Sequence, residues 1–162
     1  MRGLGMWGVG MLGLALVAPV GVEAQATGAD EAAVLEVVTR LFDGMREKDE
    51  AKLRSVWHED ARLQTAGFDG EGTPRLGSTP IDGFVSGVLG SGAELDEVTF
   101  DEVVWIDGAL ASVWAPYNLF VNGAFQHCGV DAIQMVQTSE GWKIFQLTDT
   151  RKRDGCDPER RD

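Results

Sequence analysis

The sequence holds only two histidines, and one of them, His127, stands four residues before Asp131 in a segment rich in β-formers. Side chains alternate between the two faces of a strand, so both side chains lie on one face. A carboxylate beside an imidazole fixes its tautomer and tunes its pKa, which suits general acid/base catalysis. The same pair could instead form a hydrogen bond that only closes the rim of a binding pocket, and we favour that interpretation.

Other chemistry-bearing patterns in the chain are weaker. His58 precedes Glu59 and Asp60 at the expected end of a helix, where charged side chains commonly act as solvated caps. No ligands recur at i and i+4 on a helix face, so we expect no metal site. The sequence shows neither a phosphate-binding glycine loop nor a sharp nucleophile turn. We therefore expect no metal and no cofactor.

The N-terminal segment has the pattern of a cleaved signal peptide. Arg2 precedes an apolar run over residues 4–20, and small residues at Ala24 and Ala26 provide two cleavage sites. The run is short and interrupted by glycine and proline, which argues against a membrane-spanning helix. We expect a periplasmic or secreted protein. Its predicted organisation is a signal peptide (1–24), one folded domain (27–150) and a charged tail (151–162).

The two cysteines, Cys128 and Cys156, both follow the predicted signal peptide. Export places them in an oxidising compartment, where two thiols commonly pair. We therefore predict a disulfide that ties the charged tail to the domain. The formal net charge of −12 repels phosphate backbones and anionic lipid surfaces. Nucleic-acid and membrane partners are therefore not expected.

The order of elements predicts an α+β fold. Three N-terminal helices are predicted. Apolar residues recur at helical spacing from Val34 to Met45 behind a cap at Thr27 or Asp30, and a shorter stretch runs from Asp49 to near His58. The Thr79-Pro80 start signal predicts the third helix, with Thr79 as its cap. Asp107-Gly108 and Asn122-Gly123 are strong hairpin signals. A strongly curved antiparallel sheet wrapped around about three helices leaves a pocket at its open end. The expected strands are 61–66, 73–76, 98–106, 109–121, 124–137 and 142–150.

The Asn122-Gly123 turn also predicts a register. A two-residue hairpin places Asn118 opposite His127 and Trp114 opposite Asp131. Directly opposed side chains share a face, and we assign these four to the concave side of the sheet. They are the predicted pocket wall.

That register sends Tyr117 to the convex face together with Cys128, although Tyr117 belongs to an almost wholly apolar stripe. A bulge at Pro116 would reverse the assignment and return Tyr117 to the pocket. Trp57 is a further candidate because its ring can stack on a flat ligand. The predicted ligand-binding residues are Trp57, Trp114, Asn118, His127 and Asp131.

Two pairs of segments resemble known proteins. Residues 57–63 (WHEDARL) and 141–144 (GWKI), in this order of elements, resemble the nuclear transport factor two-like, or SnoaL-like, superfamily of α+β cones. Residues 122–131 and the ending 149–153 resemble exported bacterial members of its lumazine-binding subfamily. The resemblance covers essentially the whole chain after the signal peptide, and it implies a cone-shaped fold with a pocket.

The same superfamily includes ketosteroid isomerases, scytalone dehydratases, polyketide cyclases and non-catalytic binding domains, so it implies a pocket but no particular reaction. It also implies a homodimer through the convex sheet face. The predicted function is therefore binding of a small-molecule ligand by an exported protein. The first alternative is a cofactor-free lyase, isomerase or cyclase that uses His127 and Asp131, and the second is a dimerising interaction module. Tyr117 would resemble the oxyanion-binding tyrosine of the isomerases only if it faces the pocket.

Overall fold

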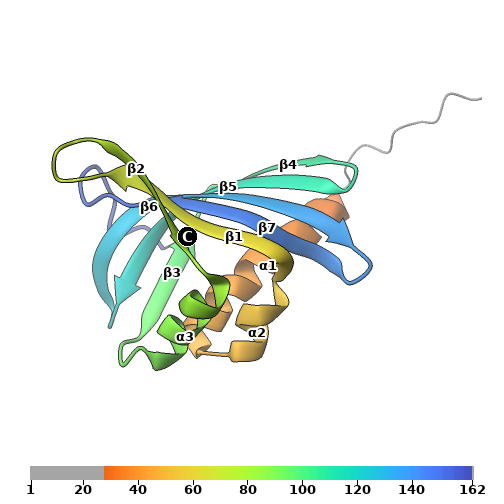
Figure 1. The fold of residues 1–162 in the computed structure, drawn as a ribbon, viewed down its shortest axis with the longest axis horizontal. Helices are drawn as coiled ribbons and strands as arrows, with labels where there is room; N and C mark the ends of the chain where they lie inside the picture. Colours follow the sequence, from red (N-terminus) through yellow and green to blue (C-terminus); the bar gives the residue numbers. More distant parts are fainter. Residues whose placement is uncertain (1–27, 162) are drawn as a thin grey trace, which may run out of the picture.

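In a computed structural model that describes residues 28–161, three helices lie together on one side of a curved sheet (Figure 1). The predicted signal peptide lies outside the described residues. The helices are α1 (Gly28–Glu47), α2 (Glu50–Ser55) and α3 (Ile81–Gly90). The seven-stranded sheet has the order β2-β1-β7-β6-β5-β3, and β4 also pairs with β5. This arrangement confirms the predicted α+β class.

The helix starts follow local capping chemistry. The Asp49 side chain accepts a hydrogen bond from the Lys52 amide at 3.0 Å and caps α2. The predicted cap at Thr79 was wrong, because Thr79 ends β2 (Pro74–Thr79) and Pro80 occupies the cap position without a side-chain hydrogen bond. A residue before proline is driven toward extended geometry, which keeps Thr79 in the strand.

The strands differ from the prediction mainly in where β1 starts and in the division of one expected strand into two. β1 (Trp57–Phe68) starts directly after α2, so His58 lies in a strand and not at a helix end. The strand expected over 98–106 is divided into β3 (Leu95–Thr99) and β4 (Val103–Asp107), and Asp101 between them has φ 50°. The remaining strands are β5 (Leu110–Val121), β6 (Ala124–Thr138) and β7 (Gly141–Thr150).

One strand pair departs from the expected antiparallel order. β1 runs parallel to β7, whereas every other pair in the sheet is antiparallel. β7 therefore lies between the N-terminal hairpin β1–β2 and the long β5–β6 hairpin. This placement brings side chains from both halves of the chain to the same concave face.

The hairpin at Asn122-Gly123 has the expected turn, since both residues have positive φ, but the predicted register beyond it was wrong. Phe120 pairs with Phe125 and Leu119 pairs with His127, so Gln126 is a bulge. Because of this one extra residue on β6, every β5 residue farther from the turn is paired one position further along β6 than predicted, so it shares a face with a different set of β6 side chains.

The bulge moves both predicted β5 pocket residues away from the concave face. Trp114 pairs with Ala132 rather than Asp131, and 48% of its surface is exposed. Asn118 pairs with Cys128, and it is buried because its amide nitrogen donates to the carbonyl oxygens of Asp157 and Arg160 at 2.8 and 2.9 Å. Asn118 therefore anchors the C-terminal tail.

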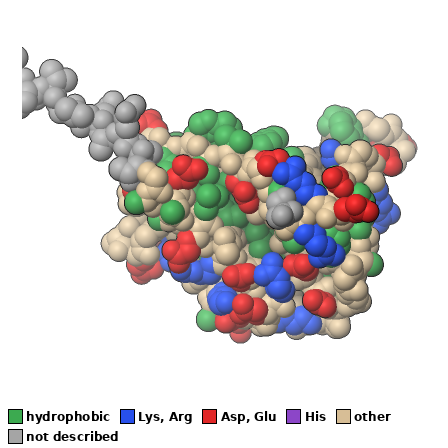
Figure 2. All heavy atoms as spheres, turned by 180° about the vertical axis from the view of Figure 1, so that it is seen from behind, with side chains coloured by type: hydrophobic (Ala, Val, Ile, Leu, Met, Phe, Trp, Pro, Cys, Tyr) green, Lys and Arg blue, Asp and Glu red, His purple; other side chains and the backbone are tan. Residues whose placement is uncertain are grey.

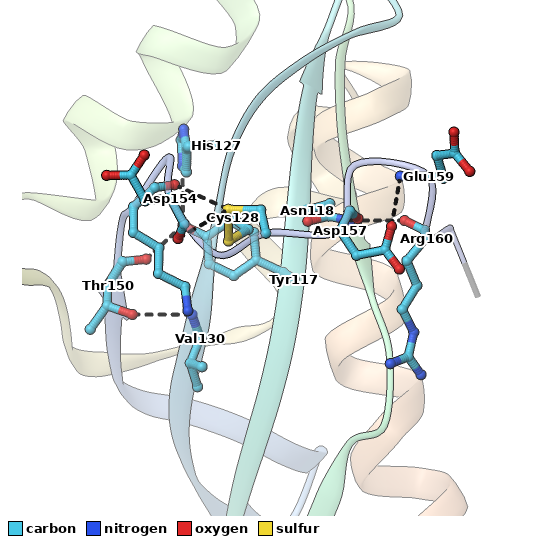
Figure 3. The surroundings of a disulfide bond; sticks show 12 residues. Tyr117, Asn118, His127, Cys128, Val130, Thr150, Asp154, Asp157, Glu159 and Arg160 are labelled. Carbon is cyan, nitrogen blue, oxygen red and sulfur yellow. Dashed lines mark hydrogen bonds between the residues drawn. A yellow bond between two sulfur atoms is a disulfide. The ribbon is translucent and has the colours of Figure 1, made fainter.

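The predicted disulfide between Cys128 and Cys156 is confirmed, with a Cα–Cα distance of 5.9 Å (Figure 3). Lys152 adds two backbone hydrogen bonds to Cys128, at 2.9 and 3.0 Å. The tail after β7 is thus fastened to β6 by covalent and backbone contacts together.

The core lies between the concave face of the sheet and the helices. Within residues 28–161, no helix combines the length and the apolar character needed to cross a membrane. α1 supplies most of the helical core, and β5, β6 and β7 supply the facing layer. The main contributors are Val34, Val38, Leu41, Phe42, Met45, Ala111, Val113, Ala115, Ile133, Met135, Ile144 and Leu147.

Candidate functional site

A cavity of about 130 Å³ lies between the helices and the concave face of the sheet. One wall is apolar and comes from α1, α3 and β1. The opposite wall is polar and comes from the strands β3, β5, β6 and β7 with the residue that follows β7. The apolar wall comprises Leu41, Phe42, Met45, Trp57, Leu63 and Phe84, and the remaining lining residues are Glu97, Tyr117, Leu119, His127, Asp131, Leu147, Asp149 and Arg151.

Strand register explains why the polar side chains converge. Glu97 is paired with Leu119, which is paired in turn with His127. Asp131 lies directly between Ala115 on β5 and Asp149 on β7. Paired residues project to the same side of a sheet, so these carboxyl and imidazole groups all face the helices.

Tyr117 and His127 form the hydrogen-bonded edge of the cavity. The Tyr117 hydroxyl donates to the Thr150 carbonyl oxygen at 2.9 Å and lies 3.1 Å from His127 Nε2. Since the hydroxyl has only one proton to donate, the network assigns the imidazole proton to Nε2, which donates to Tyr117. Burial lowers the pKa of His127, and the charges of Arg151 and Arg153 lower it further, so the ring is neutral at pH 7.

The predicted pairing of His127 with Asp131 is not formed, because His127 bonds to Tyr117 instead. Residues four apart on a strand share a face, but their backbones are about 13 Å apart, which exceeds hydrogen-bonding reach. Asp131 finds its partner across the cavity, where its side chain shares a hydrogen bond with Glu97.

Two carboxyl groups that share a hydrogen bond must hold a proton between them. Burial raises the pKa of Asp131 well above its ordinary value, and the charge of Glu97 adds to this effect. Burial also raises the pKa of Glu97 to about 7. Asp131 therefore acts as the proton donor and Glu97 as the acceptor. Because the folded-state pKa of Glu97 exceeds its unfolded value, its contribution to stability is lost as the pH rises through about 7.

Asp149 is the third carboxylate that lines the cavity, and Nε of Arg151 lies 2.6 Å from its Oδ2 atom. Three side-chain atoms on the cavity residues are buried without any hydrogen-bond partner in the described protein: Trp57 Nε1, Asp131 Oδ2 and Asp149 Oδ1. A buried polar group without a partner costs about 1–3 kcal/mol. The cavity thus offers one donor and carboxyl oxygens to a ligand.

The structure brings three of the five predicted site residues to the cavity. Trp57, His127 and Asp131 line it, and the Trp57 ring meets Phe84 edge-on with the ring centroids 6.1 Å apart. Trp114 and Asn118 lie elsewhere, as the register correction explains. Sequence reasoning missed Glu97, Tyr117, Asp149 and Arg151 as lining residues.

The sequence did contain a pattern that indicates the correct facing of Tyr117. The apolar stripe through Ala111, Val113 and Ala115 is buried on the core side, and Tyr117 continues that stripe. The stripe was therefore a better guide to facing than the turn register. For Asp149 and Arg151, the only signal was their position in the ending that resembles the lumazine-binding subfamily.

Gly129 allows the Tyr117 ring and the start of the tail to approach β6. A Cβ atom at this position would lie 1.8 Å from the Thr150 carbonyl oxygen and 2.8 Å from the Tyr117 ring. The first contact is with backbone, which a rotamer change cannot relieve. The Tyr117–Thr150 hydrogen bond therefore depends on glycine at position 129.

Comparison with known families supports the same assignment of fold. The family model described as "Putative lumazine-binding" matches residues 29–147. No curated protein matches the chain.

Several solved structures share the fold at low sequence identity. A protein of unknown function with a cystatin-like fold from Nostoc punctiforme has 9% identity and a TM-score of 0.65, covering 81% of this chain and 97% of its own. An NTF2-like protein from Novosphingobium aromaticivorans has 17% identity and a TM-score of 0.62, covering 79% and 84%. A protein from Streptomyces avermitilis, described as a putative dehydratase of the NTF2-like family, has 15% identity and a TM-score of 0.59, covering 76% and 96%.

The role of Gly129 can be tested by a pair of alanine substitutions. Gly129→Ala should destabilise the protein by about 1–3 kcal/mol, the scale for overpacking, because its Cβ meets backbone. Gly77→Ala on β2 is the control, since the nearest atom there is 3.8 Å from the added Cβ. Urea unfolding at unchanged m-value measures both free energies of unfolding. Equal midpoints for the two variants would contradict the close approach at Gly129.

Proposed function

We propose that this chain, which belongs to the family described as "Putative lumazine-binding", binds a small, flat and largely apolar molecule with a polar edge in the cavity. The family match and the shared fold confirm the NTF2-like resemblance seen in the sequence. One observation carries the proposal: a cavity with one apolar wall presents three buried polar atoms that have no partner in the described protein.

The dimensions and lining of the cavity support a flat aromatic ligand. Its volume of about 130 Å³ is close to that of an engineered cavity, roughly 150 Å³, that accommodates benzene. The rings of Trp57 and Phe84 lie on one side, and aromatic groups favour stacked or edge-on contact. Lumazine, named in the family description, is a fused heteroaromatic ring with carbonyl and N–H groups. Trp57 Nε1 can donate to such a carbonyl, and Asp149 can accept from such an N–H.

Titration with lumazine tests the proposal directly. Trp57→Phe keeps an aromatic ring but removes the buried donor, so lumazine affinity should fall roughly fivefold, the net value of one hydrogen bond. Trp114→Phe is the matched control, because Trp114 is exposed away from the cavity and its replacement should leave affinity unchanged. Isothermal titration calorimetry measures each dissociation constant. Absence of lumazine binding, or equal losses in the two variants, would contradict the proposal.

Acid/base catalysis is the second candidate, and the Glu97–Asp131 pair favours it. A carboxyl group with a pKa of about 7 exchanges protons readily at neutral pH, and a neighbouring neutral acid can donate a hydrogen bond to a developing negative charge. Mass spectrometry of lumazine after incubation with the protein separates the candidates. Unchanged lumazine supports binding alone, whereas a product that Glu97→Gln no longer forms supports catalysis.

We also infer that the protein is exported to the periplasm or beyond the cell. The disulfide supports this inference, because such bonds persist in oxidising compartments. The apolar N-terminal run with its two cleavage sites supports it independently. Sequencing the N-terminus of the exported protein should give Gln25 or Thr27 as the first residue. A chain that still begins at Met1 would contradict export by cleavage.

The convex face of the sheet is the proposed dimer surface. Val103, Trp105 and Trp114 are 44%, 60% and 48% exposed, and Val103 is the strand partner of Trp114. Adjacent exposed apolar side chains of this size are typical of interaction surfaces. Trp105→Arg should convert a dimer to a monomer in light scattering, whereas Phe68→Arg at the end of β1 should not. A wild-type monomer at micromolar concentration would count against the dimer.

A further inference from the structure

The cavity continues outward into an open hollow of about 700 Å³. Leu119, His127 and Arg151 line both spaces, so the hollow forms the mouth of the cavity. A ligand whose ring occupies the cavity would extend any substituent into this mouth. The charge and polarity of the residues at the mouth therefore determine which substituents of a ligand are bound there.

Three consecutive cationic residues, Arg151, Lys152 and Arg153, line the mouth of the cavity, although the chain as a whole has a net charge of −12. Elsewhere acidic and basic side chains mix on the surface (Figure 2) and commonly pair, as Arg46 does with Asp43 and Asp96. Among residues 28–161, neither Lys152 nor Arg153 takes part in an ion pair. Their charges are available to a ligand.

The backbone fixes the cations in place. Lys152 exchanges two hydrogen bonds with Cys128, and the disulfide to Cys156 closes the chain back onto β6 four residues later (Figure 3). The Tyr117 hydroxyl holds the Thr150 carbonyl just before the cationic run. Positive charge held on an ordered backbone binds an anion at a lower entropic cost than charge on a free tail.

Charge separation along the pocket gives a bound molecule one favoured direction. Glu97, Asp131 and Asp149 line the inner wall, where Arg151 is already paired with Asp149, whereas Lys152 and Arg153 line only the mouth. Asp154, the residue after the cationic run, does not line the mouth. Arg151 and Arg153 both lower the pKa of His127, so their charges act on the groups of this mouth.

We propose that the ligand carries an anionic group, such as a carboxylate, phosphate or sulfonate, which the Arg151–Arg153 segment binds while an apolar ring fills the cavity. This inference rests on the proposed binding function and adds the chemical class of the ligand. An acidic protein surface otherwise repels anions, so the segment provides selectivity as well as affinity.

Two fluorescent dyes that differ by one charged group provide the test. 8-Anilinonaphthalene-1-sulfonate carries a sulfonate, and N-phenyl-1-naphthylamine is the same ring system without it. The wild-type protein should bind the sulfonate more tightly, and this preference should shrink as salt rises to about 0.5 M. Lys152→Gln/Arg153→Gln should weaken sulfonate binding roughly fivefold or more and leave binding of the neutral dye unchanged.

The control variant Arg62→Gln/Arg75→Gln removes two positive charges from β1 and β2 and should leave binding of both dyes unchanged. Equal losses of sulfonate binding in the two double variants would overturn the proposal, because overall charge would then explain the effect. Equal and salt-independent binding of the two dyes would also overturn it, while leaving the binding cavity intact. If neither dye binds the wild-type protein, the proposed binding function fails together with this inference.

Discussion

Gln126 is skipped in the pairing between β5 and β6, and the composition of the cavity follows from that irregularity. Side chains alternate strictly along a strand, so one unpaired residue decides which half of β6 shares a face with which half of β5. With the bulge, Tyr117 lies opposite Gly129 and Ala115 opposite Asp131. Without it, the register of the turn would place Trp114 opposite Asp131 and Tyr117 opposite Cys128, so Tyr117 and His127 would lie on different faces and their hydrogen bond could not form.

The bulge concentrates ionisable groups where water is scarce, and the protein compensates within the site. Burying an ionised carboxylate without a partner is strongly unfavourable. Arg151 neutralises Asp149, and Asp131 shares a proton with Glu97. The remaining buried oxygens of Asp131 and Asp149 have no partner in the described protein, so the compensation is incomplete. A bound ligand that supplies hydrogen-bond donors would complete it.

Local signals were sufficient to predict the helices and the hairpins, whereas the disulfide was predicted from export and the presence of two cysteines. Periodic apolar residues, the helix start at Asp49 and the two turn dipeptides act over a few residues, so each can be read without knowing the fold. The position of the bulge has no comparable signal. The apolar stripe that continues to Tyr117 conflicts with the turn register and so requires an irregularity, but Gln126 is an ordinary strand residue that nothing in the sequence marks as unpaired. The Glu97–Asp131 contact joins β3 to β6 across the cavity and is likewise invisible in local sequence.

Tyr117 is the only tyrosine in the chain, so a selective ¹³Cζ-tyrosine label gives one NMR signal that reports directly on its facing. Burial and the neighbouring carboxylates raise the pKa of Tyr117 above its ordinary value of about 10. If β6 is bulged at Gln126, the ¹³Cζ chemical shift at pH 10.5 stays at the value of the protonated hydroxyl in the folded protein. It changes only after unfolding. Ionisation of the folded protein with a pKa near 10 would place Tyr117 in solvent and contradict the register on which the cavity depends.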